Sequence, residues 1–340
     1  PATTAFAQDD PPAGVFGELI EVRVVNVEVV VTDKKGNRVP DLKASDFRLK
    51  VDGKEVPIEY FSEIRGGQAI ESGAAEKSPV PGLAGLAPGS DVGTSYLVFI
   101  DDYFSVPAQR DRVLRSLKDD LARMGPEDRM AIVAYDGKSV EMLSTWNGSA
   151  NALSRAFDQA LVRRAHGLER ISELRSFETS RRPQANTFGN RALALETRLA
   201  VDELQYARSL AFQVERSVSA AVTTLRGFAS PPGRKVMILL SGGWPYSPAD
   251  YAVDDPNRPL AERDVPTGEQ LYRPLTDTAN LLGYTVYPVD VPGLDSNLVD
   301  ASLSGSPRNV GGFNQRENEI HSSLEYVASE TGGTGETNKM

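Results

Sequence analysis

The chain has 340 residues, of which 40% are hydrophobic and 25% are charged, so a sizeable folded core is expected and wholesale disorder is excluded. The formal net charge of -10 argues against nucleic acid as the main partner, because an acidic surface repels the phosphate backbone. The absence of cysteine excludes disulfides, thiolate metal sites and cysteine catalysis.

The first residues resemble the end of an export signal. Ala5-Phe6-Ala7, followed by Gln8-Asp9-Asp10, has the small-x-small pattern of a signal-peptidase cleavage site. The alternative is an N-terminus that merely contains alanines. No stretch of the sequence approaches the ~18 apolar residues of a membrane span. We therefore expect a signal-peptide remnant and flexible N-terminus over residues 1–17, and a mature chain in the periplasm or outside the cell.

Residues 18–65 are predicted to form a small antiparallel, β-sandwich-like domain. Residues 21–32 are rich in β-branched side chains that largely alternate with polar ones, and a turn follows them. Residues 47–51 alternate again and lead into an Asp-Gly turn, after which residues 56–61 close the unit. Residues 66–93 are rich in Gly, Ala, Pro and Ser without periodicity, which indicates a linker.

From residue 94 onward the pattern changes to alternating strands and helices. The predicted strands are residues 95–100, 130–135, 140–146, 235–240 and 284–289, and the predicted helices are residues 107–124, 148–164, 271–282 and 317–330. Such alternation is typical of a doubly wound, mostly parallel α/β sheet of the Rossmann type. The segment at 140–146 follows its predecessor too closely for a helical crossover, so it is predicted to be an antiparallel edge strand.

A long helical insertion is predicted at residues 165–205. Residues 190–227 carry apolar side chains at helical spacing, and a helix of that length spans about 57 Å, roughly twice what crossing the sheet requires. Its N-terminal half should project past the rim of the sheet, beside a second helical segment at 165–182. The resulting hairpin is either a partner-binding arm or a cover for apolar surface of the same chain.

The order of these elements, with several short motifs, is similar to the von Willebrand factor A fold. More narrowly, it resembles the bacterial VWFA-related family that is abundant in acidobacteria. The motifs are Val31-Thr32-Asp33-Lys34-Lys35-Gly36, Asp46-Phe47, Asp52-Gly53-Lys54, Phe99-Ile100-Asp101, Pro232-Gly233-Arg234-Lys235, Leu239-Leu240-Ser241-Gly242-Gly243 and Glu330-Thr331-Gly332-Gly333. The resemblance covers residues 18–335 and implies a von Willebrand factor A-like domain at 94–335 in an exported protein.

The resemblance also implies where a cation would bind. In the family, an Asp-x-Ser-x-Ser motif after the first strand and an Asp after the fourth hold a divalent ion. Here Tyr103 replaces the first Ser, and Gly242 stands where the second Asp is expected. Asp101 and Ser105 remain as weak candidate ligands for Mg²⁺ or Ca²⁺. No cofactor is expected, and we favour the alternative in which Asp101 hydrogen-bonds backbone amides at the following helix start.

The expected function is an exported protein-interaction or adhesion module with a degenerate metal-ion-dependent adhesion site, and not an enzyme. Ligands bind at the carboxyl ends of the strands in open α/β sheets. The predicted partner-binding residues are Asp101, Asp102, Tyr103, Asp136, Ser241, Trp244, Tyr246 and Asp290. The partner would be a protein ligand or an envelope assembly, and the oligomeric state stays open.

Two other functions remain open. One is a structural subunit of an extracellular or envelope assembly. The other is a metal-dependent hydrolase at Asp101, Asp102 and Asp290. A zinc site or catalytic triad built on histidine is not expected, because His166 and His321 are the sole histidines and lie far apart in the sequence.

Overall fold

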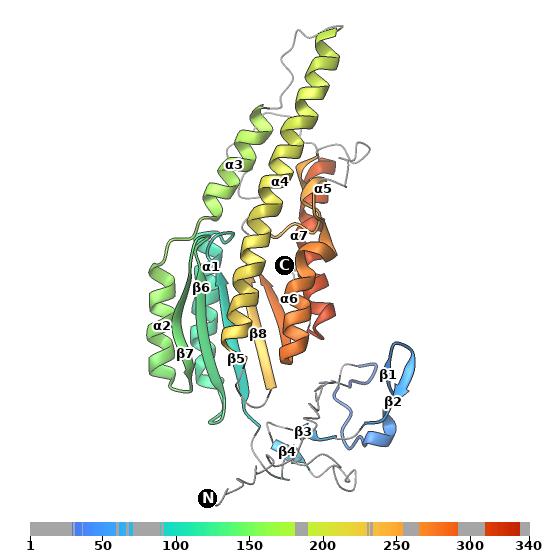
Figure 1. Ribbon diagram of the computed structural model, residues 1–340. Coiled ribbons are helices and arrows are strands. Elements are labelled where there is room, and N and C mark those ends of the chain that lie inside the picture. Colours follow the sequence, from blue (N-terminus) through green and yellow to red (C-terminus); the bar gives the residue numbers. More distant parts are fainter. Residues whose placement is uncertain are drawn as a thin grey trace, which may run out of the picture.

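The chain folds around one five-stranded sheet (Figure 1). The computed structural model describes residues 29, 31–35, 37–58, 61–65, 68–70, 89, 92–180, 190–229, 231, 234–253, 265–291 and 310–333. The predicted signal-peptide remnant at residues 1–17, and most of the strand expected at 21–32, lie outside the described residues.

The sheet has the strand order β7-β6-β5-β8-β9, which is 3-2-1-4-5 when its strands are numbered along the chain. Its strands are β5 (Thr94–Asp101), β6 (Arg129–Tyr135), β7 (Val140–Asn147), β8 (Arg234–Ser241) and β9 (Tyr284–Asp290). Neighbouring strands are parallel except for β7, which runs antiparallel to β6. The structure therefore confirms a mixed α/β architecture, a mostly parallel sheet with doubly wound order, and the antiparallel edge strand.

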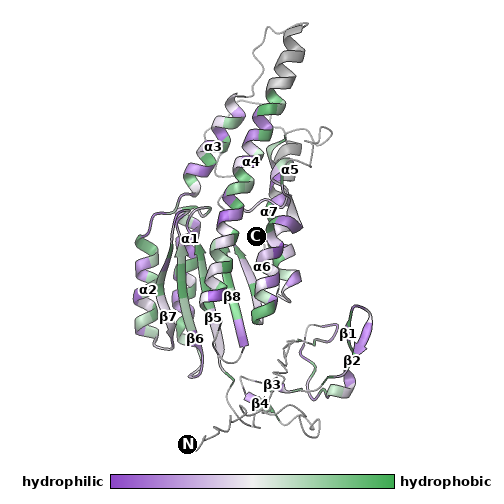
Figure 2. Cartoon of the chain, viewed as in Figure 1, coloured by the Kyte–Doolittle hydropathy of each residue, from purple (hydrophilic) through white to green (hydrophobic). Residues whose placement is uncertain are grey.

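Helices cover both faces of this sheet (Figure 1). One face is covered by α1 (Pro107–Asp120) and α2 (Ala150–Val162), and the other by α4 (Asn190–Gly227), α6 (Gly268–Leu282) and α7 (Val310–Glu330). Because the central strands are buried on both sides, they read as continuous apolar runs, and Figure 2 shows them largely hydrophobic. The helix expected at 107–124 ends in a short 3-10 turn at Leu121–Arg123.

Local chemistry explains where α2 and α6 begin and end. The Ser149 hydroxyl accepts a hydrogen bond from the backbone N–H of Ala152 at the start of α2. A capping box between Thr267 and Gln270 starts α6. Gly283 ends α6 with a φ of 71°, a left-handed conformation that glycine adopts without strain, and β9 follows at once. These signals therefore set the crossover from α6 into the sheet.

The described N-terminal residues form two separate two-stranded antiparallel sheets. β1 (Leu49–Val51) pairs with β2 (Lys54–Val56), and β3 (Glu63–Arg65) pairs with β4 (Gln68–Ile70). Two expectations are corrected here. A strand ends at Val56, where one was predicted to begin, and the second hairpin crosses the predicted boundary between residues 65 and 66. Such short strands carry too few residues for a periodic signal.

A helical layer rises beyond the carboxyl ends of the strands (Figure 1). It contains α3 (Gly167–Ser180), the N-terminal half of α4 and α5 (Pro248–Ala252). The bounds of α4 confirm the long helix predicted at 190–227. α4 also covers apolar surface of the same chain, because its Ala207 and Ala211 pack against Ala249 and Ala252 of α5. Among the described helices, none combines the length and hydropathy that crossing a bilayer requires.

Candidate functional site

The first core strand ends at Asp101, whose side chain is fully buried. Its Oδ1 accepts hydrogen bonds from the backbone N–H groups of Tyr103 (3.1 Å) and Phe104 (3.3 Å). Its Oδ2 accepts from the Ser241 hydroxyl (3.1 Å) and from the Trp244 indole Nε1 (2.7 Å). Each carboxylate oxygen therefore has two donors, and the predicted bonding of Asp101 to backbone amides at the helix start is confirmed.

Asp101 is an acid held by neutral donors. Burial raises its pKa to about 6, because the charged form loses its hydration, while the hydrogen bonds from Trp244, Phe104 and Ser241 act in the opposite direction. The hydrogen bonds therefore offset part of the desolvation cost and leave a carboxylate that titrates above its usual range.

The donors around Asp101 do not fit a divalent cation. The Trp244 N–H points at Oδ2, and the Ser105 hydroxyl donates to the backbone oxygen of Asp101 at 2.6 Å. A cation needs free oxygen lone pairs, and those of the Asp101 carboxylate are directed at four hydrogen-bond donors. No group of three or more His, Cys, Asp or Glu side chains placed to hold a metal occurs among the residues that the structure describes. The contacts of Asp101 therefore disfavour it as a ligand for Mg²⁺ or Ca²⁺, and the weak assignment of Asp101 and Ser105 as metal ligands stays a prediction.

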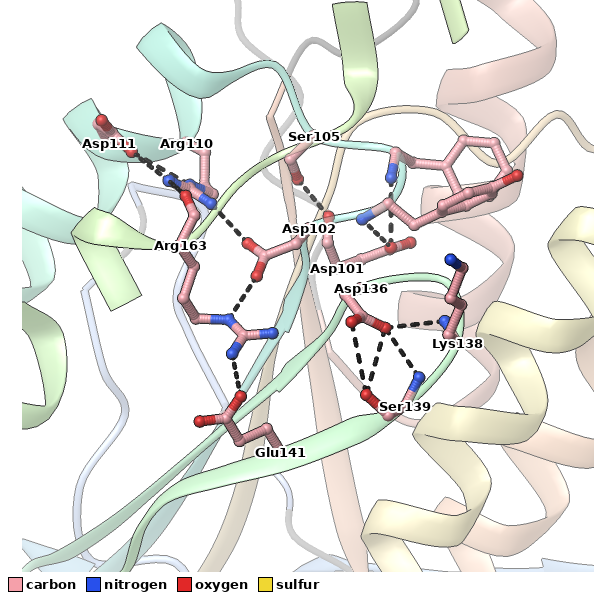
Figure 3. Close-up of polar contacts among 12 residues, drawn as sticks. Asp101, Asp102, Ser105, Arg110, Asp111, Asp136, Lys138, Ser139, Glu141 and Arg163 are labelled. Atoms are coloured by element: carbon pink, nitrogen blue, oxygen red, sulfur yellow. Dashed lines mark hydrogen bonds and ion pairs between the residues drawn. The ribbon is translucent and has the colours of Figure 1, made fainter. Parts of the chain in front are cut away.

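The neighbouring Asp102 is the centre of a buried ion-pair network (Figure 3). Arg110 Nη1 donates to Oδ1 at 2.7 Å, and Arg163 Nε donates to Oδ2 at 2.8 Å. Arg110 also contacts Asp111 and the backbone oxygen of Arg163, and Arg163 continues to Glu141 on β7. Burial raises the pKa of Asp102, and the two arginines limit that rise. The network joins α1, the end of α2 and the sheet edge.

The sequence reasoning missed both arginines of this network. Arg110 lies one helical turn before Leu114, on the apolar face of α1, and its side chain is only 1% exposed. A charged residue at a buried position of an amphipathic helix signals an internal ion pair, because a buried charge needs a partner. Arg163 directly follows α2 and carried no comparable signal.

The base of the helical hairpin is bonded directly to the loop after β5. The backbone N–H of His166 donates to the oxygen of Asp102 at 2.7 Å, and that of Gly167 donates to the oxygen of Ser105 at 2.9 Å. A Cβ at Gly167 would lie 2.5 Å from the Ser105 oxygen, so only glycine permits this approach. The start of α3 is thus fixed to the corner that holds Asp101.

Tyr103 makes a further contact with α3. Its phenol oxygen accepts a hydrogen bond from Arg170 Nη1 at 2.7 Å, and the Arg170 guanidinium lies 4.6 Å from the ring centroid. Gly137 also lies against the ring, and a Cβ there would come within 2.3 Å of it. Tyr103 therefore joins the β6–β7 turn to the hairpin, and its ring fills the space beside Asp101.

Four of the predicted partner-binding residues cannot contact a partner directly. Asp101, Asp102, Ser241 and Trp244 are all fully buried. Trp244 was predicted to bind a partner, but its ring stacks on Tyr272 with 6.0 Å between centroids and its indole N–H donates to Asp101. The prediction correctly placed these residues at the carboxyl ends of the strands. It did not predict that helices cover that end of the sheet.

The remaining predicted residues are distributed around the rim. Asp136 is partly exposed in the β6–β7 turn and accepts backbone hydrogen bonds from Lys138 (2.8 Å) and Ser139 (2.7 Å). Burial by itself would raise the pKa of Asp136. The hydrogen bonds from Ser139 and Lys138 favour the charged form and bring the pKa below its usual value. Tyr246 is partly exposed, and Asp290 is nearly buried with one carboxylate oxygen 3.7 Å from His321 Nε2.

Comparison with known proteins adds little to this geometry. No family model and no curated protein matches the chain. Among solved structures, it is similar to an aerotolerance-related membrane protein from Bacteroides fragilis NCTC 9343 with multiple mutations to serines. That likeness covers 73% of this chain and 92% of the other, with 9% identity and a TM-score of 0.34. A likeness at this TM-score carries no argument about fold or function, so the interpretation depends on the described contacts.

Proposed function

We propose that the chain is an exported protein-interaction module of von Willebrand factor A-like architecture whose binding does not depend on a cation. The strand order 3-2-1-4-5 with an antiparallel edge supports this architecture. The observation that carries the proposal is the closed corner at Asp101. Its oxygens are satisfied by Trp244, Ser241 and backbone amides, and α3 is bonded over it. This arrangement supports a mode of binding in which no cation is shared with a partner.

The proposed contact surface is the arm formed by α3 and residues 190–216 of α4. Three large apolar side chains of these helices are exposed to solvent: Leu168 is 57% exposed, Val201 is 47% exposed and Phe212 is 59% exposed. The guanidinium of Arg216 lies 5.9 Å from the Phe212 ring centroid. Aromatic and arginine side chains on a rigid support are typical anchors of protein interfaces. The arm is such a support, because backbone hydrogen bonds fix its base.

Capture of partners from the native envelope fraction, with crosslinking, tests this proposal. The double variant Val201→Ser/Phe212→Ser should reduce the yield of the specific crosslinked partner at least tenfold, and a chelator should change nothing. Leu281→Ser is the matched control, because Leu281 is 72% exposed on α6, away from the arm. Undiminished capture by the double variant would contradict the arm, and capture that is lost with chelator and restored by Mg²⁺ would contradict cation independence.

The same material tests the other functions. A structural subunit of an envelope assembly should elute as a large complex in size-exclusion chromatography of the native protein. A metal-dependent hydrolase should retain bound metal and turn over substrates in a phosphatase and esterase screen. The contacts lend the hydrolase no support, because the oxygens of Asp101 and Asp102 are already hydrogen-bonded. Export is supported by Ala5-Phe6-Ala7 and is tested by fractionation of the native cells.

A further inference from the structure

A pocket of about 400 Å³ lies between α3 and α4, directly above the loop that follows β5. Phe104 and Leu210 contribute apolar atoms to it, and both side chains are otherwise buried. Its size lies within the range of about 300–1,000 Å³ that is usual for small-ligand sites. The helices meet again beside the pocket, where Phe177 stacks on Tyr206 with 4.2 Å between centroids. The two helices therefore border an open hollow at the base of the arm.

The α4 residues that line this pocket are mostly polar. Tyr206, Ser209 and Gln213 follow one another at helical spacing and all line the pocket. Positions that face a partner helix are normally apolar, because burial of that face is what holds two helices together. Here Tyr206 stacks on Phe177 of α3, whereas Ser209 is exposed and Gln213 is partly exposed, so these two side chains present polar groups to the hollow instead of packing against α3.

The pocket offers no net charge to a ligand. Its charged side chains are Arg170 and Glu173 on α3, and they form an ion pair at 2.6 Å. Arg170 is engaged further by the Tyr103 phenol. An anion would meet the Glu173 carboxylate and a cation would meet the Arg170 guanidinium, so the pocket favours an uncharged occupant.

The remaining polar groups both donate and accept hydrogen bonds. This holds for the side chains of Ser172, Ser176, Ser209, Tyr206 and Gln213. The Ser176 hydroxyl donates to the backbone oxygen of Ser172 at 2.9 Å, whereas the hydrogen bond from Gln213 Nε2 to Ser209 Oγ is long, at 3.5 Å. Groups with this dual capacity are best matched by ligand groups that have it too, and the hydroxyl is the common example. An aromatic ring beside them suits the apolar face of a ring-shaped ligand.

We propose that the α3–α4 pocket is a binding site for a neutral sugar unit, such as the end of a glycan. A monosaccharide or disaccharide supplies many hydroxyl groups, no charge and apolar C–H faces, which together complement these residues. An uncharged peptide segment, with its separate donors and acceptors, is the competing occupant. The sugar site extends beyond the proposed protein-binding function and does not depend on it, because it uses the inside of the arm rather than its exposed apolar side chains.

Saturation-transfer NMR on the full chain tests the site. The probes are neutral sugars (glucose, galactose, mannose, N-acetylglucosamine and their disaccharides) beside uncharged capped tripeptides. Binding of at least one sugar should weaken at least tenfold in Ser209→Leu, which fills the pocket. Ser219→Leu is the matched control, since Ser219 is exposed on the same helix and does not line the pocket. A Gln213→Ala variant, which leaves the pocket open, should weaken binding less.

Three outcomes overturn the sugar site: no sugar binds, binding survives Ser209→Leu, or only the tripeptides bind. The proposed protein interaction is scored separately, because Val201 and Phe212 do not line the pocket. The Val201→Ser/Phe212→Ser variant should therefore keep sugar binding, and Ser209→Leu should keep partner capture. Loss of one activity without the other then shows which of the two proposals fails.

Discussion

The buried cluster around Asp101 and Asp102, here called the corner, differs from the pocket above it in how its polar groups are used. At the corner, each oxygen of Asp101 has two donors and both oxygens of Asp102 meet an arginine. In the pocket, Ser209 and Gln213 make only one long contact with each other. Polar groups that are satisfied inside the chain hold the fold together, whereas polar groups that face a hollow remain available to a ligand. The comparison predicts large stability effects at the corner and small ones in the pocket.

The largest effect is expected from Arg110→Ala, which removes one partner of the buried pair with Asp102. Because the carboxylate stays buried and keeps only Arg163, the free energy of unfolding should fall by about 3–5 kcal/mol. Urea denaturation measures it. Arg115→Ala is the control, because the Arg115 side chain is 64% exposed and its ion pair with Asp111 is long, at 3.9 Å. A loss below about 1 kcal/mol in Arg110→Ala would mean that this network does not hold the corner.

The next effect is a pH dependence caused by Asp101. Its folded pKa of about 6 lies above the ordinary value, so the folded state binds a proton more readily than the unfolded state. This contribution to stability is fully present below about pH 4 and is lost as the pH rises through about 6, with a span of about 3 kcal/mol. The Ser241 hydroxyl can accommodate protonation by accepting where it now donates.

Unfolding of the wild type and of Asp101→Asn between pH 4 and 8 measures this span. Asparagine does not titrate, so the stability advantage of the wild type should grow as the pH falls from 8 to 4. Asp277→Asn, at a side chain that is 72% exposed, is the control for the substitution itself. An advantage that instead grows toward pH 8 would show that the carboxylate at 101 is stabilised as an anion, contrary to the described burial.

A smaller effect is expected from Trp244→Phe, which keeps an aromatic ring against Tyr272 and removes the indole N–H. Loss of one hydrogen bond to a charged group should cost about 1.5–3 kcal/mol in unfolding free energy. It should also raise the pKa of Asp101 further, because that bond favours the anion. Trp146→Phe is the matched control, since Trp146 packs edge-on against Phe228 and lies away from Asp101. Equal losses of unfolding free energy in Trp244→Phe and Trp146→Phe would show that the hydrogen bond from the Trp244 indole N–H to Asp101 does not stabilise the fold.

The fold could be predicted better than the corner, because the patterns that indicate strands and helices are local in the sequence, whereas the contacts of the corner are not. Strand burial and helical spacing repeat every few residues, so α4 and the edge strand β7 could be predicted from the sequence. The bond between Trp244 and Asp101 joins residues 143 positions apart, and no local pattern encodes it. The resemblance predicted that Tyr103 and Gly242 stand where the family has cation ligands. It gave no sign that the Trp244 indole N–H bonds to Asp101.

The same limit applies to the pocket. Its residues lie on two helices that the sequence did predict, yet whether their polar side chains pack together or leave a hollow depends on how α3 and α4 approach each other. Tyr206, Ser209 and Gln213 share one side of α4, whereas the prediction of that helix rested on its apolar residues alone.

The smallest effect is expected from Gln213→Ala, and its smallness is informative. If the pocket residues serve a ligand and not the fold, removing this amide should change the free energy of unfolding by no more than about 0.5 kcal/mol. Gln205→Ala, at an exposed position of the same helix, controls for the change in helix propensity. A difference above about 1.5 kcal/mol between the two variants would mean that the pocket amide stabilises the hairpin. The contrast between a structural corner and an available pocket would then fail.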